Sequence, residues 1–233
     1  TNTSSITRTI GIDNIAPTVS VSGFTPTSGA AYLYASGTTM YYNPANAASF
    51  DVNVTASDAY SGMAYVTFPA FTAPWGQTTT ANDSSSPYSR NYSYTAGAPA
   101  PTLQQVIAVD NTGNQATANF TVTSDSGKPV GGSISYLNGN TKLTSASITL
   151  SSGTDTISGI GSWQIQRREA TYAAGTCGAM GAWSDLGAAS QTSPYNDASI
   201  ASGKCYEYQL VVTDHVGNTE TFTNANQLKV DQG

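Results

Sequence analysis

The feature that most constrains this sequence is an internal repeat, in which five short motifs occur in the same order in both halves. The motifs are Asp-x-x-x-Pro (13–17 and 125–129), Asp-x-x-Ser-Gly (58–62 and 155–159), a tryptophan (Trp75 and Trp183), Ser-Pro-Tyr (86–88 and 193–195) and Asp-x-x-Gly-Asn (110–114 and 214–218). Each motif alone is weak, because Asp, Gly and Asn are common in turns. Corresponding motifs lie 97 to 112 positions apart, which is typical of one β-sandwich per repeat.

The pattern of apolar residues favours strands over helices. No segment has the i, i+3, i+4, i+7 apolar spacing of an amphipathic helix, and Thr, Ser, Tyr, Val and Gly dominate. Only 9% of residues are charged, but 14 Tyr, 6 Phe and 3 Trp give the chain enough apolar surface for a core. Alternating segments predict strands at 17–22, 50–56, 63–69, 103–109 and 115–123, and at 132–136, 146–150, 161–168, 206–213 and 219–230.

We therefore expect an all-β chain of two tandem immunoglobulin-like β-sandwich domains joined by a short Asp-x-x-x-Pro linker. The expected modules are residues 14–124 and 125–233. Residues 1–13 are expected to be the trailing strand of a preceding module or an N-terminal exchange strand. The first module has additional tyrosine-rich sequence around Ser36-Gly37, which predicts an extra hairpin.

The charge of the chain argues against some classes of partner. The net charge is −6 and the eight basic residues are scattered, so a nucleic-acid surface is not expected. No apolar run approaches the ~20 residues that span a bilayer. The sequence begins at Thr1 without a signal peptide, which is expected of a mature, processed or excised chain.

The two cysteines, Cys177 and Cys205, both lie in the second half. They lack metal-ligand spacing, and the Thr/Ser/Tyr-rich composition suggests an oxidising compartment, so a disulfide is expected. The alternative is a pair of unpaired buried thiols. On the segment from Tyr206, alternation places the core side chains on the face opposite Cys205, which predicts a peripheral bridge.

Six aspartates from the repeated motifs are candidate calcium ligands. They are Asp13, Asp58 and Asp110 in the first module and Asp125, Asp155 and Asp214 in the second. If they meet at one end of each sandwich, their oxygen atoms suit Ca²⁺. The alternative is that each Asp caps its own turn by accepting from a nearby backbone N–H. No other cofactor is expected.

Catalytic readings fit the sequence poorly, and we expect no enzyme activity. The single histidine, His215, occupies a turn position where the first module has Asn111. Nothing marks a serine and a carboxylate to complete a triad around it, and no glycine-rich phosphate loop is present. The carboxylates of Glu169, Glu207 and Glu220 lie on expected strands of one module, without a predicted cleft.

The aromatic residues offer a candidate binding surface at Tyr32, Tyr34, Tyr41 and Tyr42. Cross-strand packing is the alternative for these tyrosines. Trp75 and Trp183 recur at matching positions, which favours packing in the core over contact with a ligand.

The joints at 13–17 and 125–129, the Asp-x-x-Ser-Gly motifs and the Asp-x-x-Gly-Asn hairpins resemble those of bacterial Ig-like tandem-repeat proteins, which are secreted or lie on the cell surface. The resemblance implies a non-catalytic stalk, adhesin or filament, located outside the cell. Its partners would be neighbouring modules of the same chain or identical subunits. The alternatives are a module that binds a surface glycan or a protein, and an accessory domain of a large extracellular enzyme. The segment Ser4–Ile12 could complete a neighbouring subunit by strand addition.

Overall fold

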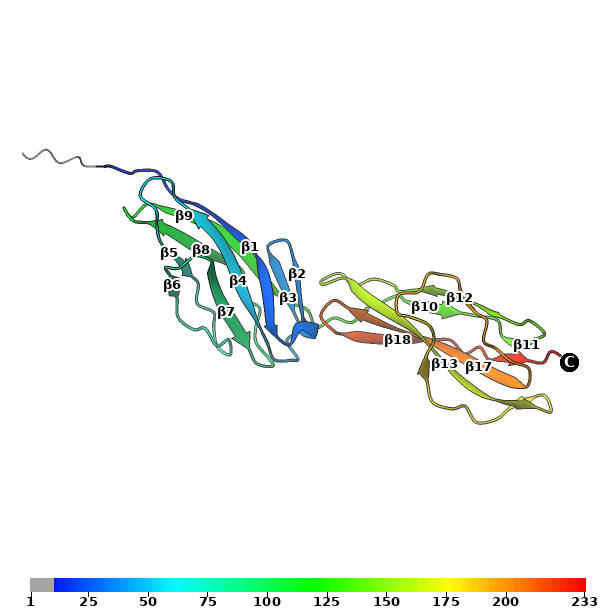
Figure 1. Cartoon of the computed structure of the whole chain (residues 1–233). Helices are drawn as coiled ribbons and strands as arrows, with labels where there is room; N and C mark the ends of the chain where they lie inside the picture. The colour runs from blue at the N-terminus through cyan, green and yellow to red at the C-terminus, as the bar shows by residue number, and fades with distance from the viewer. Residues whose placement is uncertain (1–10) are drawn as a thin grey trace, which may run out of the picture. The chain divides into compact units, whose positions relative to one another are not determined.

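The computed structural model of the chain describes residues 11–233, and Figure 1 shows strands joined by turns and loops, with one short 3-10 helix as the other regular element of the described part. These residues form two compact units. One unit contains residues 11–30, Ala35–Met40 and Asn46–Thr123, and the other contains Ala31–Tyr34, Tyr41–Ala45 and Ser124–Gly233. None of the described segments is a helix with the length and apolarity that a membrane span requires.

Two sheets form the first sandwich. One sheet has the order β1-β4-β7, and the other has the order β2-β3-β9-β8-β5-β6. The strands are β1 (Thr18–Ser28), β2 (Leu33–Ser36), β3 (Thr39–Tyr42), β4 (Ala48–Ser57), β5 (Met63–Phe68), β6 (Ala81–Asp83), β7 (Tyr88–Tyr94), β8 (Thr102–Asp110) and β9 (Gln115–Ser124). The predicted tyrosine-rich hairpin is present as β2 and β3, preceded by a short 3-10 turn, η1 (Ala30–Tyr32).

The second sandwich repeats this plan. One sheet has the order β10-β12-β16, and the other contains β11-β19-β17-β13-β14, with β15 paired to β13 and β18 paired to β17. The strands are β10 (Ser133–Ser135), β11 (Gly139–Thr141), β12 (Ala146–Ser151), β13 (Ile160–Ala173), β14 (Thr176–Cys177), β15 (Ser184–Asp185), β16 (Tyr195–Asp197), β17 (Lys204–Asp214), β18 (Thr219–Thr223) and β19 (Leu228–Val230).

The distribution of strands between the sheets identifies the fold. In the first sandwich β1, β4 and β7 form one sheet, and β5, β8 and β9 belong to the other. In the second sandwich β10, β12 and β16 form one sheet, and β13, β17 and β18 belong to the other. This is the immunoglobulin-like partition, in which the A, B and E strands face the C, F and G strands. The predicted fold class is confirmed: the chain holds two immunoglobulin-like β-sandwiches.

Aromatic packing fills the first core. Phe50, Trp75, Tyr92 and Phe120 are at most 2% exposed, and the ring centroids of Phe50 and Trp75 lie 6.2 Å apart in an edge-to-face arrangement. Burial of each large side chain contributes roughly 1.5–3 kcal/mol. The expectation that Trp75 packs in the core is confirmed.

The second core is built on the alternation of β17. Tyr206, Tyr208, Leu210 and Val212 point to the same face of this strand and are at most 1% exposed. They pack with Ile134, Ile148 and Ile165 of the facing and neighbouring strands. The core face predicted for this strand is confirmed.

The last predicted strand of the second module, 219–230, is interrupted. β18 ends at Thr223 and β19 begins at Leu228, and the residues between them use side-chain amides to bond elsewhere. Asn224 donates to the carbonyl of Ile134, and Asn226 donates to the carbonyl of Tyr136. These bonds hold the segment away from the ladder, so one predicted strand is observed as two.

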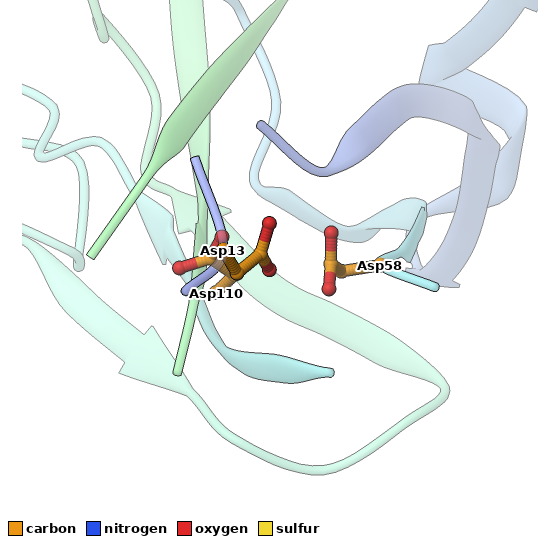
Figure 2. Close-up of side chains that lie close together, drawn as sticks. All are labelled: Asp13, Asp58 and Asp110. Carbon is orange, nitrogen blue, oxygen red and sulfur yellow. The ribbon is translucent and has the colours of Figure 1, made fainter. Parts of the chain in front are cut away.

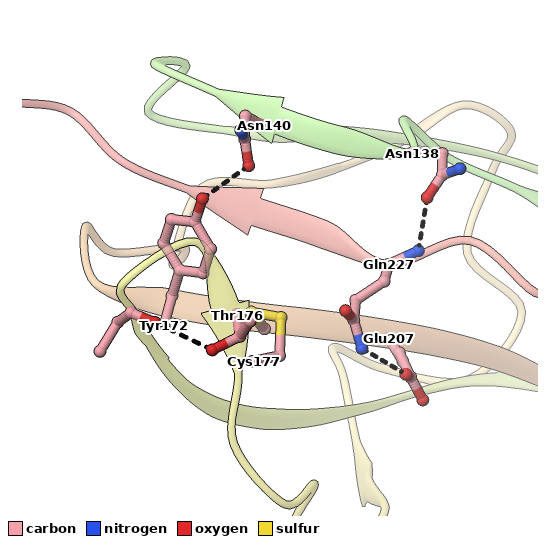
Figure 3. The surroundings of a disulfide bond; sticks show 9 residues. Asn138, Asn140, Tyr172, Thr176, Cys177, Glu207 and Gln227 are labelled. Carbon is pink, nitrogen blue, oxygen red and sulfur yellow. Dashed lines mark hydrogen bonds between the residues drawn. A yellow bond between two sulfur atoms is a disulfide. The ribbon is translucent and has the colours of Figure 1, made fainter.

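The predicted disulfide joins Cys177 of β14 to Cys205 of β17, with 5.9 Å between the Cα atoms (Figure 3). Cys205 faces away from the core cluster, as strand alternation predicted, but it is fully buried. The bridge is peripheral, as predicted, because it joins two strands of one sheet on the face away from the core and does not cross between the sheets. Cys205 is nevertheless buried, because the Cys177 side chain bonds over it and β13 and β19 pair on either side. The bridge pins the β13–β14 hairpin to the sandwich.

Candidate metal-binding site

Each sandwich gathers three of the six candidate aspartates at one end. Asp13 precedes β1, Asp58 follows β4, and Asp110 is the last residue of β8 (Figure 2). One carboxylate oxygen from each of these residues lies within 4.8 Å of the other two. The same limit holds for the cluster of Asp125, Asp155 and Asp214. Aspartates up to 97 positions apart in the first module and 89 in the second therefore meet in space, once in each unit.

The aspartates also cap their own turns. Asp58 Oδ1 accepts from the amides of Tyr60, Ser61 and Gly62, at 2.8 to 3.0 Å. In the second unit, Asp155 Oδ1 accepts from Ile157 and Gly159, at 3.0 and 2.8 Å. Turn capping, which the sequence offered as an alternative to clustering, occurs together with it.

The aspartate that leads into each sandwich bonds across to the Asp-x-x-Ser-Gly loop. Asp13 Oδ2 accepts from the amide of Ser61 at 3.0 Å, and Asp125 Oδ2 accepts from the amide of Ser158 at 3.0 Å. These bonds connect positions 48 and 33 residues apart in sequence. The leading segment is thereby fixed to the end of the sandwich that it enters.

Two asparagines complete the clusters, whereas the sequence suggests only a turn-forming role for them. Asn114 donates to Asp110 Oδ2 at 2.7 Å and to the carbonyl of Asp13 at 3.2 Å. Asn218 donates in the same way to Asp214 Oδ2 at 2.7 Å and to the carbonyl of Asp125 at 3.3 Å. The signal that could have found them is the final Asn of both Asp-x-x-Gly-Asn motifs, because a glycine hairpin needs no asparagine after its turn.

The electrostatic environments of the two clusters differ. Burial acts to raise the pKa of Asp110, but hydrogen bonds from Asn114 and Thr112 outweigh it and hold that pKa at about 2. The hydrogen bond from the backbone of Ile15 lowers the pKa of Asp13. In the second cluster, burial and the charge of Asp125 raise the pKa of Asp214. Ionisation is therefore less favourable for Asp214, chiefly because of its burial, than for Asp110 at the matching place in the first cluster.

Within residues 11–233, no basic side chain forms an ion pair with the second cluster. Asp125 and Asp214 are 0% and 4% exposed, and none of the ion pairs between residues 11 and 233 involves them or Asp155. Buried charges in proteins are normally paired or coordinate a metal. The hydroxyl of Ser158, whose amide binds Asp125, is also buried and has no hydrogen-bond partner in the described part of the chain.

The chemistry of the ligand set selects among metals. All candidate ligands are oxygen atoms, which suit hard cations such as Ca²⁺ and Mg²⁺. Two oxygens on the same Ca²⁺, each at ~2.4 Å, lie up to about 4.8 Å apart, whereas the octahedral shell of Mg²⁺ is smaller. The oxygens of each cluster lie within 4.8 Å of one another, which is compatible with a shared Ca²⁺.

The tyrosine surface expected from the sequence is only partly available. Tyr42 is fully buried, so its inclusion in that surface was wrong. Tyr32, Tyr34 and Tyr41 are half-buried, and within the second unit the ring of Tyr34 stacks on that of His215 with 3.9 Å between centroids. Strand alternation turns Tyr42 inward, while stacking occupies a face of Tyr34.

Comparison with known proteins adds only distant likenesses in fold. No family model and no curated protein matches the sequence. Among solved structures, murine CEACAM1b is 11% identical, with 89% of this chain and 98% of that chain covered and a TM-score of 0.31. The N-terminal Ig1-2 module of the Drosophila receptor protein tyrosine phosphatase DLAR is 10% identical, with 93% and 100% covered and a TM-score of 0.27.

Proposed function

We propose that this chain is a non-catalytic structural segment of a secreted or cell-surface protein, in which each immunoglobulin-like module binds Ca²⁺ at its three-aspartate end. Its role would be that of a stalk, an adhesin or an extracellular filament. The observation that carries the proposal is the cluster of Asp125, Asp155 and Asp214, which combines short spacing, burial of two of its members and, in the described part of the chain, no ion pair with a basic side chain.

A metal at this place would stiffen the entry to each sandwich. Asp125 belongs to the segment leading into the second module, Asp155 to a loop between strands, and Asp214 to a hairpin. A shared Ca²⁺ would link these three pieces of backbone, and the proline that follows each leading aspartate further restricts the segment. Limited bending is what a load-bearing module requires.

Two further observations support a location outside the cell. The Cys177–Cys205 disulfide is typical of proteins from oxidising compartments. With only 9% charged residues, the surface obtains much of its polarity from hydroxyls and amides, as on the sheet β1-β4-β7, where Asn91 donates to Thr27 and Asp51. Assembly by strand exchange would involve Ser4–Ile12, a segment that lies mostly outside the described residues 11–233.

Calorimetric titration of the metal-free chain with CaCl₂ tests the proposal. We expect two sites, one of which is lost in Asp58→Asn and the other in Asp155→Asn. Calcium at 100 times its dissociation constant should stabilise the occupied module by about 2.7 kcal/mol. Asp231→Asn is the matched control, because this exposed aspartate lies outside both clusters.

The proposal predicts that removing calcium with a chelator lowers the unfolding midpoint of each module. If calcium produces no heat, and the unfolding midpoints are equal in CaCl₂ and in EGTA, the clusters are capped turns and nothing more. Binding that survives in both aspartate variants would place the metal elsewhere and overturn the assignment.

A further inference from the structure

A groove on the outer face of the second sandwich combines an ion pair with an aromatic ring. It has a volume of about 290 Å³ and is lined by residues of β13, β17 and the end of β18, together with a tryptophan from the segment before β15. Its lining side chains include Arg168, Trp183, Glu207, Thr223 and Asn224. All belong to one unit.

The polar groups of the groove are held in fixed positions. Arg168 Nε donates to Glu207 Oε2 at 2.8 Å, and the guanidinium carbon lies 4.5 Å from the centroid of the Trp183 ring. The other oxygen of Glu207 accepts from Gln227 at 3.1 Å (Figure 3). A ligand would therefore meet an arrangement of donors and acceptors that is already ordered, which lowers the entropic cost of binding.

Trp183 differs from the other two tryptophans. The indole N–H groups of Trp75 and Trp163 donate to the backbone carbonyls of Pro99 and Gln191, at 2.8 and 2.9 Å. Trp183 is only half-buried, and its indole N–H has no acceptor within residues 11–233. The expectation that both repeat-related tryptophans pack in the core is therefore wrong for Trp183.

This difference has a physical reason. The segment between β13 and the Ser-Pro-Tyr motif is longer in the second module and carries the β14 hairpin and the disulfide. This longer segment places Trp183 over the outer face of the sheet, where the guanidinium of Arg168 lies over its ring. A large amphipathic ring with a free donor at a groove is a common recognition element.

The polar surface continues along the strands beside the groove. Gln166 and Gln209 are paired across β13 and β17, and they lie on the same face as the pair Arg168 and Glu207. Gln209 donates to Gln166 at 2.7 Å, and Gln166 donates to Asp185 at 2.9 Å. The result is a row of ordered amides and carboxylates next to an aromatic ring.

We infer that this groove is a binding site for a neutral carbohydrate. The apolar C–H face of a sugar ring would pack on Trp183, and its hydroxyls would bind Arg168, Glu207 and the indole N–H. Glu207 neutralises Arg168, and the whole chain has a net charge of −6, so a neutral ligand fits better than an anionic one. The site is independent of the aspartate clusters, which lie in other loops.

Affinity electrophoresis of the full chain through gels containing soluble neutral polysaccharides tests the inference. The probes are laminarin, galactomannan, arabinoxylan, dextran and hydroxyethyl cellulose, each run in EGTA to exclude any effect of calcium. We expect retardation by at least one probe and a change in tryptophan emission on binding. Trp183→Ala should weaken binding by about tenfold or more.

Two controls make the result decisive. Tyr60→Ala removes an aromatic ring that is 72% exposed in the first unit and should leave binding unchanged. Thr223→Lys places a long cation in the groove from an exposed position on β18 and should block binding even if Trp183→Ala does not fold. The inference is overturned if no probe retards the wild-type chain, or if a folded Trp183→Ala or Thr223→Lys variant binds as well as the wild type.

Discussion

Reduction of the Cys177–Cys205 disulfide should destabilise the second unit while leaving the first unchanged. The bridge closes a loop with a sequence separation of 28, and both cysteines lie within Ser124–Gly233. On the chain-entropy model, opening a loop of this length costs ~3.6 kcal/mol at 25 °C. Each residue that the bridge restrains in the unfolded chain lies in the second sandwich, so the first sandwich serves as an internal control.

The measurement is a urea titration of oxidised and reduced protein, followed by hydrogen exchange and mass spectrometry. Peptides from β17 and β4 report separately on the two units. With a typical urea dependence of 1–3 kcal/mol per molar, the β17 midpoint should fall by roughly 2 M on reduction, and the β4 midpoint should not move. The reasoning is refuted if the β17 peptides lose less than about 1 kcal/mol, or if both units are destabilised equally.

Three further predictions concern the unfolding free energy. Asp197→Asn should cost about 3 kcal/mol, because Asp197 is 1% exposed and its charge lies 2.8 Å from the guanidinium of Arg167, which would keep only the more distant and more exposed Glu169, at 3.9 Å. Thermal unfolding measures this loss. The folded-state pKa of Asp110, about 2, lies below its ordinary value of 3.8. Ionised Asp110 therefore stabilises the first unit above about pH 4, and this stabilisation is lost as the pH falls from about 4 to 2. Denaturant titrations across this range measure the loss, and an unfolding free energy that does not change with pH would contradict it. Gly153→Ala should cost at least about 2 kcal/mol, because Gly153 has a φ of +72° and a Cβ would lie 2.2 Å from the carbonyl oxygen of Val130; an unchanged midpoint for the second unit would be inconsistent with this geometry.

The repeated motifs made much of the fold predictable. Alternation of apolar residues depends on local sequence, so the segments around Phe50, Val66 and Leu210 gave the correct strands and faces. The aspartate clusters could also be predicted from the sequence, because each motif lies at the end of a strand and the loops of a sandwich gather at its two ends. Their two asparagines were missed because asparagine in a turn needs no further explanation.

The remaining features depend on contacts between distant residues. Trp183 repeats Trp75 in sequence, but the longer connection before it changes the surface on which its ring lies. The short strand β11 has no apolar alternation, because it is Gly139-Asn140-Thr141 and is defined only by pairing with β19. The break between β18 and β19 follows from amides that bond to the opposite sheet, and no local pattern encodes that choice.

The pairing of β11 with β19 has a consequence for how the second module would respond to pulling. The two strands are parallel, with Gly139 opposite Leu228 and Thr141 opposite Val230. Tension applied through the two ends of the module would pull β11 towards its N-terminus and β19 towards its C-terminus. The hydrogen bonds between them would then be loaded together, in shear, instead of opening one after another as in a zipper. The strand that sequence patterns could not reveal is thus placed where the module would resist extension in shear.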